Sequence, residues 1–105
     1  MAINEKKYTR YFKAFSDPSR LKIIKLLSGK EMTVNEVARA MGLSQPTISR
    51  QLAILREADI VIYRRDGQQV HYSLNKNKIQ ECCCGFCITL EIPVRTPAGS
   101  KKSKK

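Results

Sequence analysis

The sequence is poor in acidic residues and has no long apolar run. Its 105 residues include 9 Asp and Glu against 20 Lys and Arg, which gives a formal net charge of +11. No apolar stretch approaches the roughly 20 residues that a transmembrane helix needs. The segment Met1–Tyr8 also lacks the apolar core of a secretory signal. We therefore expect neither membrane insertion nor export, and the expected location is the cytoplasm.

Residue patterns typical of enzymes are missing as well. There is no glycine-rich loop to cradle a phosphate and no pair of carboxylates on a polar face. The single histidine, His71, is not part of an obvious nucleophile arrangement, although a Cys–His pair stays open at this point. We expect no enzymatic activity and no obligatory cofactor.

The positive charge is spread along the chain. Four of the eleven net charges come from the lysines at its end, so +7 remains on the rest. A polyanion is the expected partner. A membrane surface suits the chain less well, because no basic helix has the large aromatic or leucine face with which such helices insert.

Two short amphipathic helices are expected between residues 33 and 55. The first has apolar residues at the helical period: Val34, Val37, Ala38 and Met41. Thr33 and Glu36 can form a capping box at its start, and Gly42 permits the tight exit from its end. Two helices joined by such a short glycine turn are typical of a DNA-reading helix-turn-helix.

The second helix is expected to start after Ser44, with Pro46 in its first turn. Its interior face is Ile48, Leu52 and Leu55. Its opposite face carries short polar groups and a guanidinium, which suit phosphate oxygens and base edges. The residues that we predict to contact DNA here are Ser44, Gln45, Thr47, Ser49, Arg50 and Gln51. An ordinary helical hairpin would show a similar pattern.

The residues that follow favour DNA binding. Ile60–Arg65 is rich in β-branched residues, and Asp66-Gly67 is a strong signal for a two-residue hairpin turn. Apolar residues then alternate with polar ones, as in a half-buried strand: Val70, Tyr72 and Leu74. A hairpin directly after a recognition helix is a wing. Its predicted contacts to the DNA backbone or minor groove are Arg64, Arg65 and Gln68.

Two further helices are expected before this unit. The first carries an aromatic stripe at helical spacing: Tyr8, Tyr11, Phe12 and Phe15. Such a stripe most commonly means core packing, but in a chain this short the core and a dimer interface can be one surface. Asp17 and Pro18 mark the start of the next helix, a scaffold element that ends at Gly29.

Several motifs, in this order, closely resemble the ArsR/SmtB metal-sensing repressors: Phe12–Ile24, Ser44–Leu52, Leu55–Val61 and Gly67–Leu74. The resemblance extends from about Tyr8 to Lys78. It implies a mainly α fold with a small β-hairpin (α+β), a winged helix-turn-helix that forms a homodimer through its N- and C-terminal helices. It also implies a repressor that binds an inverted-repeat operator and leaves DNA when an inducer binds. Many members have histidine where this chain has Gln51.

The chain departs from the family pattern at the sensor. The resemblance implies cysteines at the start of the first helix of the helix-turn-helix in arsenic-responsive members, where this chain has Thr33 and Asn35. Zinc-responsive members use aspartate and histidine on the last helix, whereas the histidine here is on the predicted wing. Neither familiar site can be carried over to this chain.

All 4 cysteines lie within one short segment, Cys82–Cys87, near the end of the expected last helix. Thiolates select soft ions, so the expected inducer is As(III), with Sb(III), Cd(II), Pb(II) or Zn(II) as alternatives. On a helix Cys87 shares a face with Cys83 and Cys84, whereas Cys82 points about 100° away from Cys83. The predicted ligands are therefore Cys83, Cys84 and Cys87, with Cys82 as an alternate.

Other uses of the cysteines stay open. Neighbouring thiols can form a disulfide and act as a redox switch, and single cysteines can serve as small buried apolar residues. The chain would then be a thiol redox-sensing repressor or a DNA-binding protein with no sensor. Gly85 favours a break of the helix within the cluster.

The expected organisation is one domain over residues 1–92 followed by a tail. Residues 93–105 are rich in Lys, Ser, Gly and Pro. We expect this basic tail to be disordered.

Overall fold

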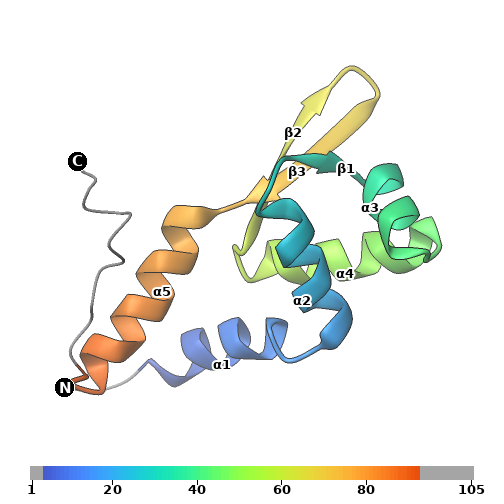
Figure 1. Ribbon diagram of the computed structural model, residues 1–105. Coiled ribbons are helices and arrows are strands. Elements are labelled where there is room, and N and C mark those ends of the chain that lie inside the picture. The colour runs from blue at the N-terminus through green and yellow to red at the C-terminus, as the bar shows by residue number, and fades with distance from the viewer. Residues whose placement is uncertain (1–3, 93–105) are drawn as a thin grey trace.

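The computed structural model describes residues 4–92 as helices around a small sheet (Figure 1). The helices are α1 Glu5–Ala14, α2 Pro18–Leu27, α3 Val34–Met41, α4 Gln45–Glu57 and α5 Lys76–Thr89. The strands are β1 Met32–Thr33, β2 Val61–Asp66 and β3 Gln69–Leu74. The mainly helical α+β fold and its winged helix-turn-helix are confirmed. The tail predicted for residues 93–105 lies outside the described residues.

The helices start at the predicted caps. The side chain of Asp17 accepts hydrogen bonds from two backbone N–H groups in the first turn of α2. Thr33 and Glu36 form the reciprocal capping box of α3, and Ser44 caps α4. At the other end of α3, Gly42 takes the left-handed conformation with φ +69, which allows the chain to turn sharply into α4.

The core lies between α2, α3, α4 and the base of the sheet. The side chains without solvent exposure are Ile23, Val37, Ile48, Leu52, Leu55 and Ile60. Val34 and Met41 pack against this core at its edge. The apolar faces predicted for both helices of the helix-turn-helix are thus confirmed.

The hairpin turns one residue later than predicted. Asp66 pairs with Gln69, so the loop residues are Gly67 and Gln68 rather than Asp66 and Gly67. Gly67 has φ +64 at the first loop position, where a type II′ turn requires glycine. Asp66 needs no special backbone conformation and therefore remains in the ladder.

A third strand joins the hairpin. Strand β1 pairs antiparallel with β3, with Met32 opposite Tyr72 and Thr33 opposite His71, and the strand order is β1-β3-β2. The sequence did not predict β1, because two residues are too few to show an alternating pattern. This strand connects the start of α3 directly to the wing.

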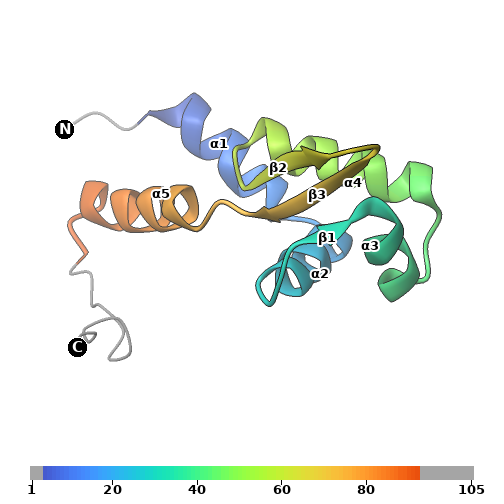
Figure 2. The same ribbon diagram turned by 90° about the horizontal axis from the view of Figure 1, so that it is seen from above.

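Helix α5 follows the sheet and packs against α1, at the end of the molecule opposite α3 (Figures 1 and 2). Aromatic rings join the two helices, with Phe86 4.8 Å from Phe12 and 5.0 Å from Tyr8 between ring centroids. The break favoured at Gly85 is wrong, since α5 continues to Thr89. A Cβ atom at Gly85 would lie 3.2 Å from the Tyr8 hydroxyl, so the glycine allows close packing of the helices. Within residues 4–92 no helix is long and apolar enough to cross a membrane.

Candidate functional site

The exposed face of α4 carries most of the residues predicted to contact DNA. Ser44, Gln45, Ser49 and Arg50 are exposed and Thr47 is half-buried. The opposite face of the same helix holds Ile48, Leu52 and Leu55, each with 0% exposure. Burial of this apolar face fixes the rotation of α4 and so presents the polar face to solvent.

Hydrogen bonds order the start of this face. The hydroxyls of Ser44 and Thr47 lie 2.8 Å apart. Gln45 Nε2 donates to Asn35 Oδ1 on α3, which ties the first turn of α4 to the preceding helix. A groove beside these residues joins α3 and α4 to the wing, and its lining includes Asn35, Gln45 and Gln68. The start of α4, the start of α3 and the hairpin therefore form one continuous surface.

Gln51 differs from the other predicted contacts. It is half-buried, and its Oε1 accepts a hydrogen bond of 2.9 Å from Arg20 Nη1. The same guanidinium donates to the carbonyl oxygens of Ala14 and Lys13 at 2.8 and 3.2 Å. Gln51 therefore links α4 to the ends of α1 and α2, and its contact with DNA stays a prediction.

The wing places Arg65 and Gln68 in exposed positions, whereas Arg64 is bound to a carboxylate. Arg64 Nε donates to Glu31 Oε2 at 3.2 Å and Nη2 donates to Glu31 Oε1 at 2.5 Å. The hydrogen bond lowers the pKa of Glu31 and raises that of Arg64. Sequence reasoning missed Glu31, because the two residues are 33 positions apart and no local pattern joins them.

The four cysteines occupy different environments along α5. Cys82 is 2% exposed and belongs to the hydrophobic core, Cys83 is exposed, and Cys84 and Cys87 are half-buried. All four are free thiols. Cys82 is thus the least accessible of the four thiols, and its place as an alternate ligand stays a prediction.

One chain does not assemble these thiols into a finished metal site. Among residues 4–92, no three or more His, Cys, Asp or Glu side chains are grouped so as to hold a metal ion. The structure brings the cysteines together on one helix but not around one point. Their chemistry fits a soft ion, and the ligand set of Cys83, Cys84 and Cys87 stays a prediction.

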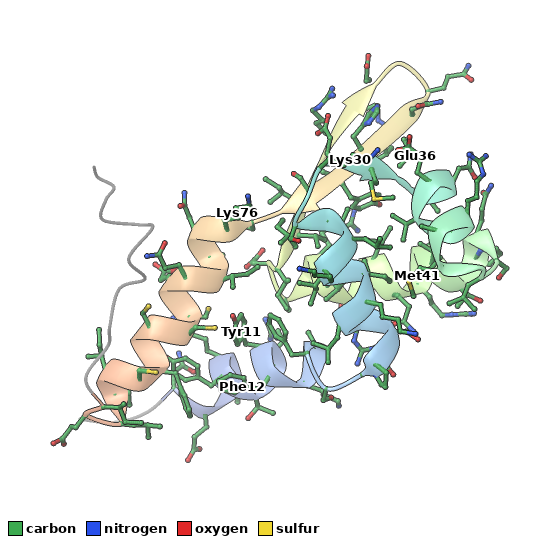
Figure 3. The ribbon with its side chains drawn as sticks, viewed as in Figure 1. Tyr11, Phe12, Lys30, Glu36, Met41 and Lys76 are labelled. Atoms are coloured by element: carbon green, nitrogen blue, oxygen red, sulfur yellow. The ribbon has the colours of Figure 1, made fainter. Side chains whose placement is uncertain are left out.

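Tyr11 of α1 is a neighbour of the cysteines that the sequence did not assign to the site. Its side chain points toward α5 (Figure 3), and its hydroxyl lies 3.0 Å from Cys83 Sγ and 3.2 Å from the carbonyl oxygen of Ile79, to which it donates. Burial, and then the contact with Cys83, raise the pKa of Tyr11. The aromatic stripe predicted only its packing role.

The helix-turn-helix, the wing and the exposed polar face of α4 define a winged-helix DNA-binding protein. Residues 17–63 match the family described as "Bacterial regulatory protein, arsR family". The chain belongs to this ArsR/SmtB family of regulatory proteins.

Two curated relatives and one solved structure illustrate the similarity. The chain is 44% identical over 70 residues to the transcriptional repressor SdpR of Bacillus subtilis, covering 67% of this chain and 78% of SdpR. It is 45% identical over 65 residues to the arsenical resistance operon repressor of Escherichia coli, covering 61% of this chain and 56% of that repressor.

The solved structure is a homodimeric winged helix-turn-helix DNA-binding domain from Mycobacterium bovis, described as a possible ArsR-family transcriptional regulator. It superposes with a TM-score of 0.68 at 26% identity and covers 82% of this chain and 81% of that one. The described fold is therefore that of a family whose members include DNA-binding regulators.

Proposed function

We propose that the chain is a cytoplasmic transcriptional repressor that binds a palindromic operator as a homodimer and leaves it when a thiophilic metal(loid), As(III) first, binds the thiols of α5. The observation that carries the proposal is the separation of two kinds of chemistry. The polar reading face lies on α4 and the wing, while all 4 cysteines lie on α5, against α1.

The reading face and the charge support operator binding. The exposed groups Gln45, Ser49 and Arg50 are hydrogen-bonding side chains of the kinds that contact base edges and phosphates. The wing adds Arg65 and Gln68 beside them. In a two-fold dimer, the two α4 helices would enter major grooves that are separated by about one helical turn or a multiple of it. This arrangement requires a near-palindromic operator.

Exposed apolar side chains support dimerisation through α1 and α5. Phe12 is 39% exposed, Ile88 62%, Leu90 48% and Ile92 49%. These residues lie on or next to the two helices that form the layer away from α3. A second copy that covers them would complete the burial that one chain leaves unfinished, and the homodimeric state of the Mycobacterium bovis domain supports dimerisation in general.

The position of the thiols supports a sensor coupled to the dimer. Thr33 and Asn35 cannot supply thiolates, so the donors available for a soft ion are those of α5. Because α5 packs on α1, an ion that draws Cys83, Cys84 and Cys87 together would shift the layer through which the copies associate. The ion then disfavours the DNA-bound geometry to the extent that it binds the shifted dimer more tightly than the DNA-bound dimer.

The test is release of DNA by the inducer. An operator is first selected by the full chain from random-sequence duplexes, and its complex is titrated with As(III), Sb(III), Cd(II), Pb(II), Zn(II) and peroxide while fluorescence anisotropy is recorded. We expect release by As(III) at the lowest concentration. The variant with Cys83, Cys84 and Cys87 changed to serine should keep its DNA affinity and lose the response. Cys82→Ala is the matched control and should still respond.

The other outcomes separate the alternatives. Release of the triple-serine variant by As(III) would contradict sensing by α5. Release by peroxide alone would favour the thiol redox switch. A chain that binds its operator and answers to none of these agents would be a DNA-binding protein without this sensor.

A further inference from the structure

Arg64 is the one predicted wing contact that the described structure holds in a two-point ion pair with a carboxylate. Glu31 lies just before β1, in the loop that follows α2, and both of its carboxylate oxygens accept from the guanidinium. The preceding residue, Lys30, lies beside the sheet in Figure 3. Asp66 adds a second carboxylate, 3.9 Å from Arg64 Nη1.

The pairing cancels the charge that Arg64 would offer to DNA. Two of its nitrogens, Nε and Nη2, donate to Glu31, and Asp66 lies nearest the third. Arg65, the next residue along β2, is exposed and has no such partner among the described residues. A guanidinium bound by a carboxylate adds no net charge to the wing, and a phosphate requires the same fork of donors.

The pair is also accessible to exchange. The side chain of Arg64 is 56% exposed and that of Glu31 is 37% exposed. Exposed ion pairs contribute little net stability, so a DNA phosphate can displace the carboxylate without disrupting the fold.

We infer that Glu31 competes with DNA for the guanidinium of Arg64. Glu31 binds Arg64 in the free protein, and Arg64 exchanges this carboxylate for a phosphate when the operator binds. Glu31 thereby positions the guanidinium and limits the affinity for DNA. This inference rests on the DNA binding in the proposed function, and not on the thiol sensor.

The test is a double-mutant cycle on the full chain. Wild type, E31Q, R64Q and the double variant are titrated with the selected operator duplex and with a scrambled duplex over a range of salt concentrations. Loss of the competitor should tighten binding of E31Q by about twofold to fivefold, the range of an exposed ion pair. R64Q should weaken binding and reduce the magnitude of the salt slope by about 0.9, the value for one phosphate contact.

The decisive result is the effect of E31Q when Arg64 is absent. In the R64Q background, E31Q should change affinity no more than the matched control E81Q does in wild type. Glu81 also forms an exposed ion pair, with Lys78 at 3.5 Å, and its replacement removes the same charge far from the wing.

Three results would overturn the inference. E31Q would tighten binding equally in both backgrounds if Glu31 acted only through net charge. It would weaken binding if the pair held Arg64 in its DNA-bound position. It would match E81Q in wild type if the guanidinium of Arg64 did not contact the DNA. Failure of every variant to bind either duplex would instead contradict the proposed function, and thermal unfolding of each variant shows whether the fold is intact.

Discussion

The helix-turn-helix and the α1–α5 layer bury their apolar residues to different extents. In the first region Val37, Ile48, Leu52 and Leu55 have no exposure, and the polar face stands free. In the second, Tyr8 and Tyr11 are buried but Phe12, Ile88 and Leu90 are 39%, 62% and 48% exposed. The first region has a fully buried core and leaves only Leu43 and Ile54 exposed among its large apolar side chains, at 40% each, whereas the second exposes its apolar side chains most strongly, at Ile88.

This difference corresponds to a division of tasks. The helix-turn-helix must be rigid to present Gln45 and Arg50 in fixed positions, and its fully buried core provides that rigidity. A layer that is finished by a second copy has two arrangements available to it, and an effector can shift the balance between them. The cysteines lie on the α1–α5 layer, where a change of packing can be communicated to the dimer.

The comparison predicts its largest effect on stability in the helix-turn-helix. Leu52→Ala should lower the free energy of unfolding by about 2 to 5 kcal/mol, because it leaves a cavity among fully buried neighbours. Ile54→Ala on the same helix is the control, since Ile54 is 40% exposed and its loss should cost well under half as much. Urea unfolding measures both variants. Equal losses would contradict the closed core.

Substitutions in the α1–α5 layer should affect dimer formation rather than folding. Ile88→Glu should leave the helical content unchanged, abolish the dimer in sedimentation, and weaken operator binding by about 100-fold, since two linked half-sites become separate. Leu21→Glu, at a site of 49% exposure on α2, is the matched control. A dimer that persists in Ile88→Glu would remove α5 from the interface.

The reading face should be sensitive to single polar side chains. Arg50→Ala is expected to cost about 1 to 3 kcal/mol of operator binding if the guanidinium reaches a guanine, and to relax preference at one position. Anisotropy titrations with the selected operator and its single-base variants measure both quantities. Unchanged affinity and unchanged preference would remove Arg50 from the reading face. Because Arg50 is exposed, its replacement by alanine should leave the fold intact.

The smallest effect on stability is expected at Tyr11, where α1 contacts the cysteine-bearing helix α5. Tyr11→Phe loses the hydrogen bond to Ile79 and the contact with Cys83, at a cost of about 1 kcal/mol of stability at neutral pH. The pKa of Tyr11 is raised by folding, so the neutral hydroxyl stabilises the fold below the ordinary pKa of about 10 and this contribution is lost as pH rises above it.

The stability difference between wild type and Tyr11→Phe should therefore be constant up to about pH 10 and shrink above it. Unfolding in urea at increasing pH measures the difference and cancels the titration of groups that are distant from Tyr11. A difference that grows with alkaline pH would show that the ionised form is the one the fold favours.

The sequence predicted the helix-turn-helix best, because its signals are local. The helical period identified the faces of α3 and α4, and Thr33, Gly42 and Ser44 marked their ends, since caps and apolar spacing act within a few residues. The hairpin was found with its loop displaced by one residue. Exposure of Gln45, Ser49 and Arg50 followed from the rotation of α4.

The sequence could not predict contacts between distant residues. Glu31 and Arg64 are 33 positions apart and Arg20 and Gln51 are 31 apart, so each pair depends on how elements pack. Strand β1 is defined by its partner β3 rather than by its own two residues. The low helix propensity of glycine favours a helix break at Gly85, whereas the close approach of α1 gives this glycine a packing role.

The central claim is that the thiols of α5 and the reading face of α4 are energetically coupled, and the most direct test is the affinity for As(III) with and without operator DNA. Coupling is reciprocal, so the factor by which As(III) weakens DNA binding must equal the factor by which DNA weakens As(III) binding. We predict weaker binding of As(III) to the DNA complex than to free protein, by a matching factor. Equal affinities in the two states would contradict the account.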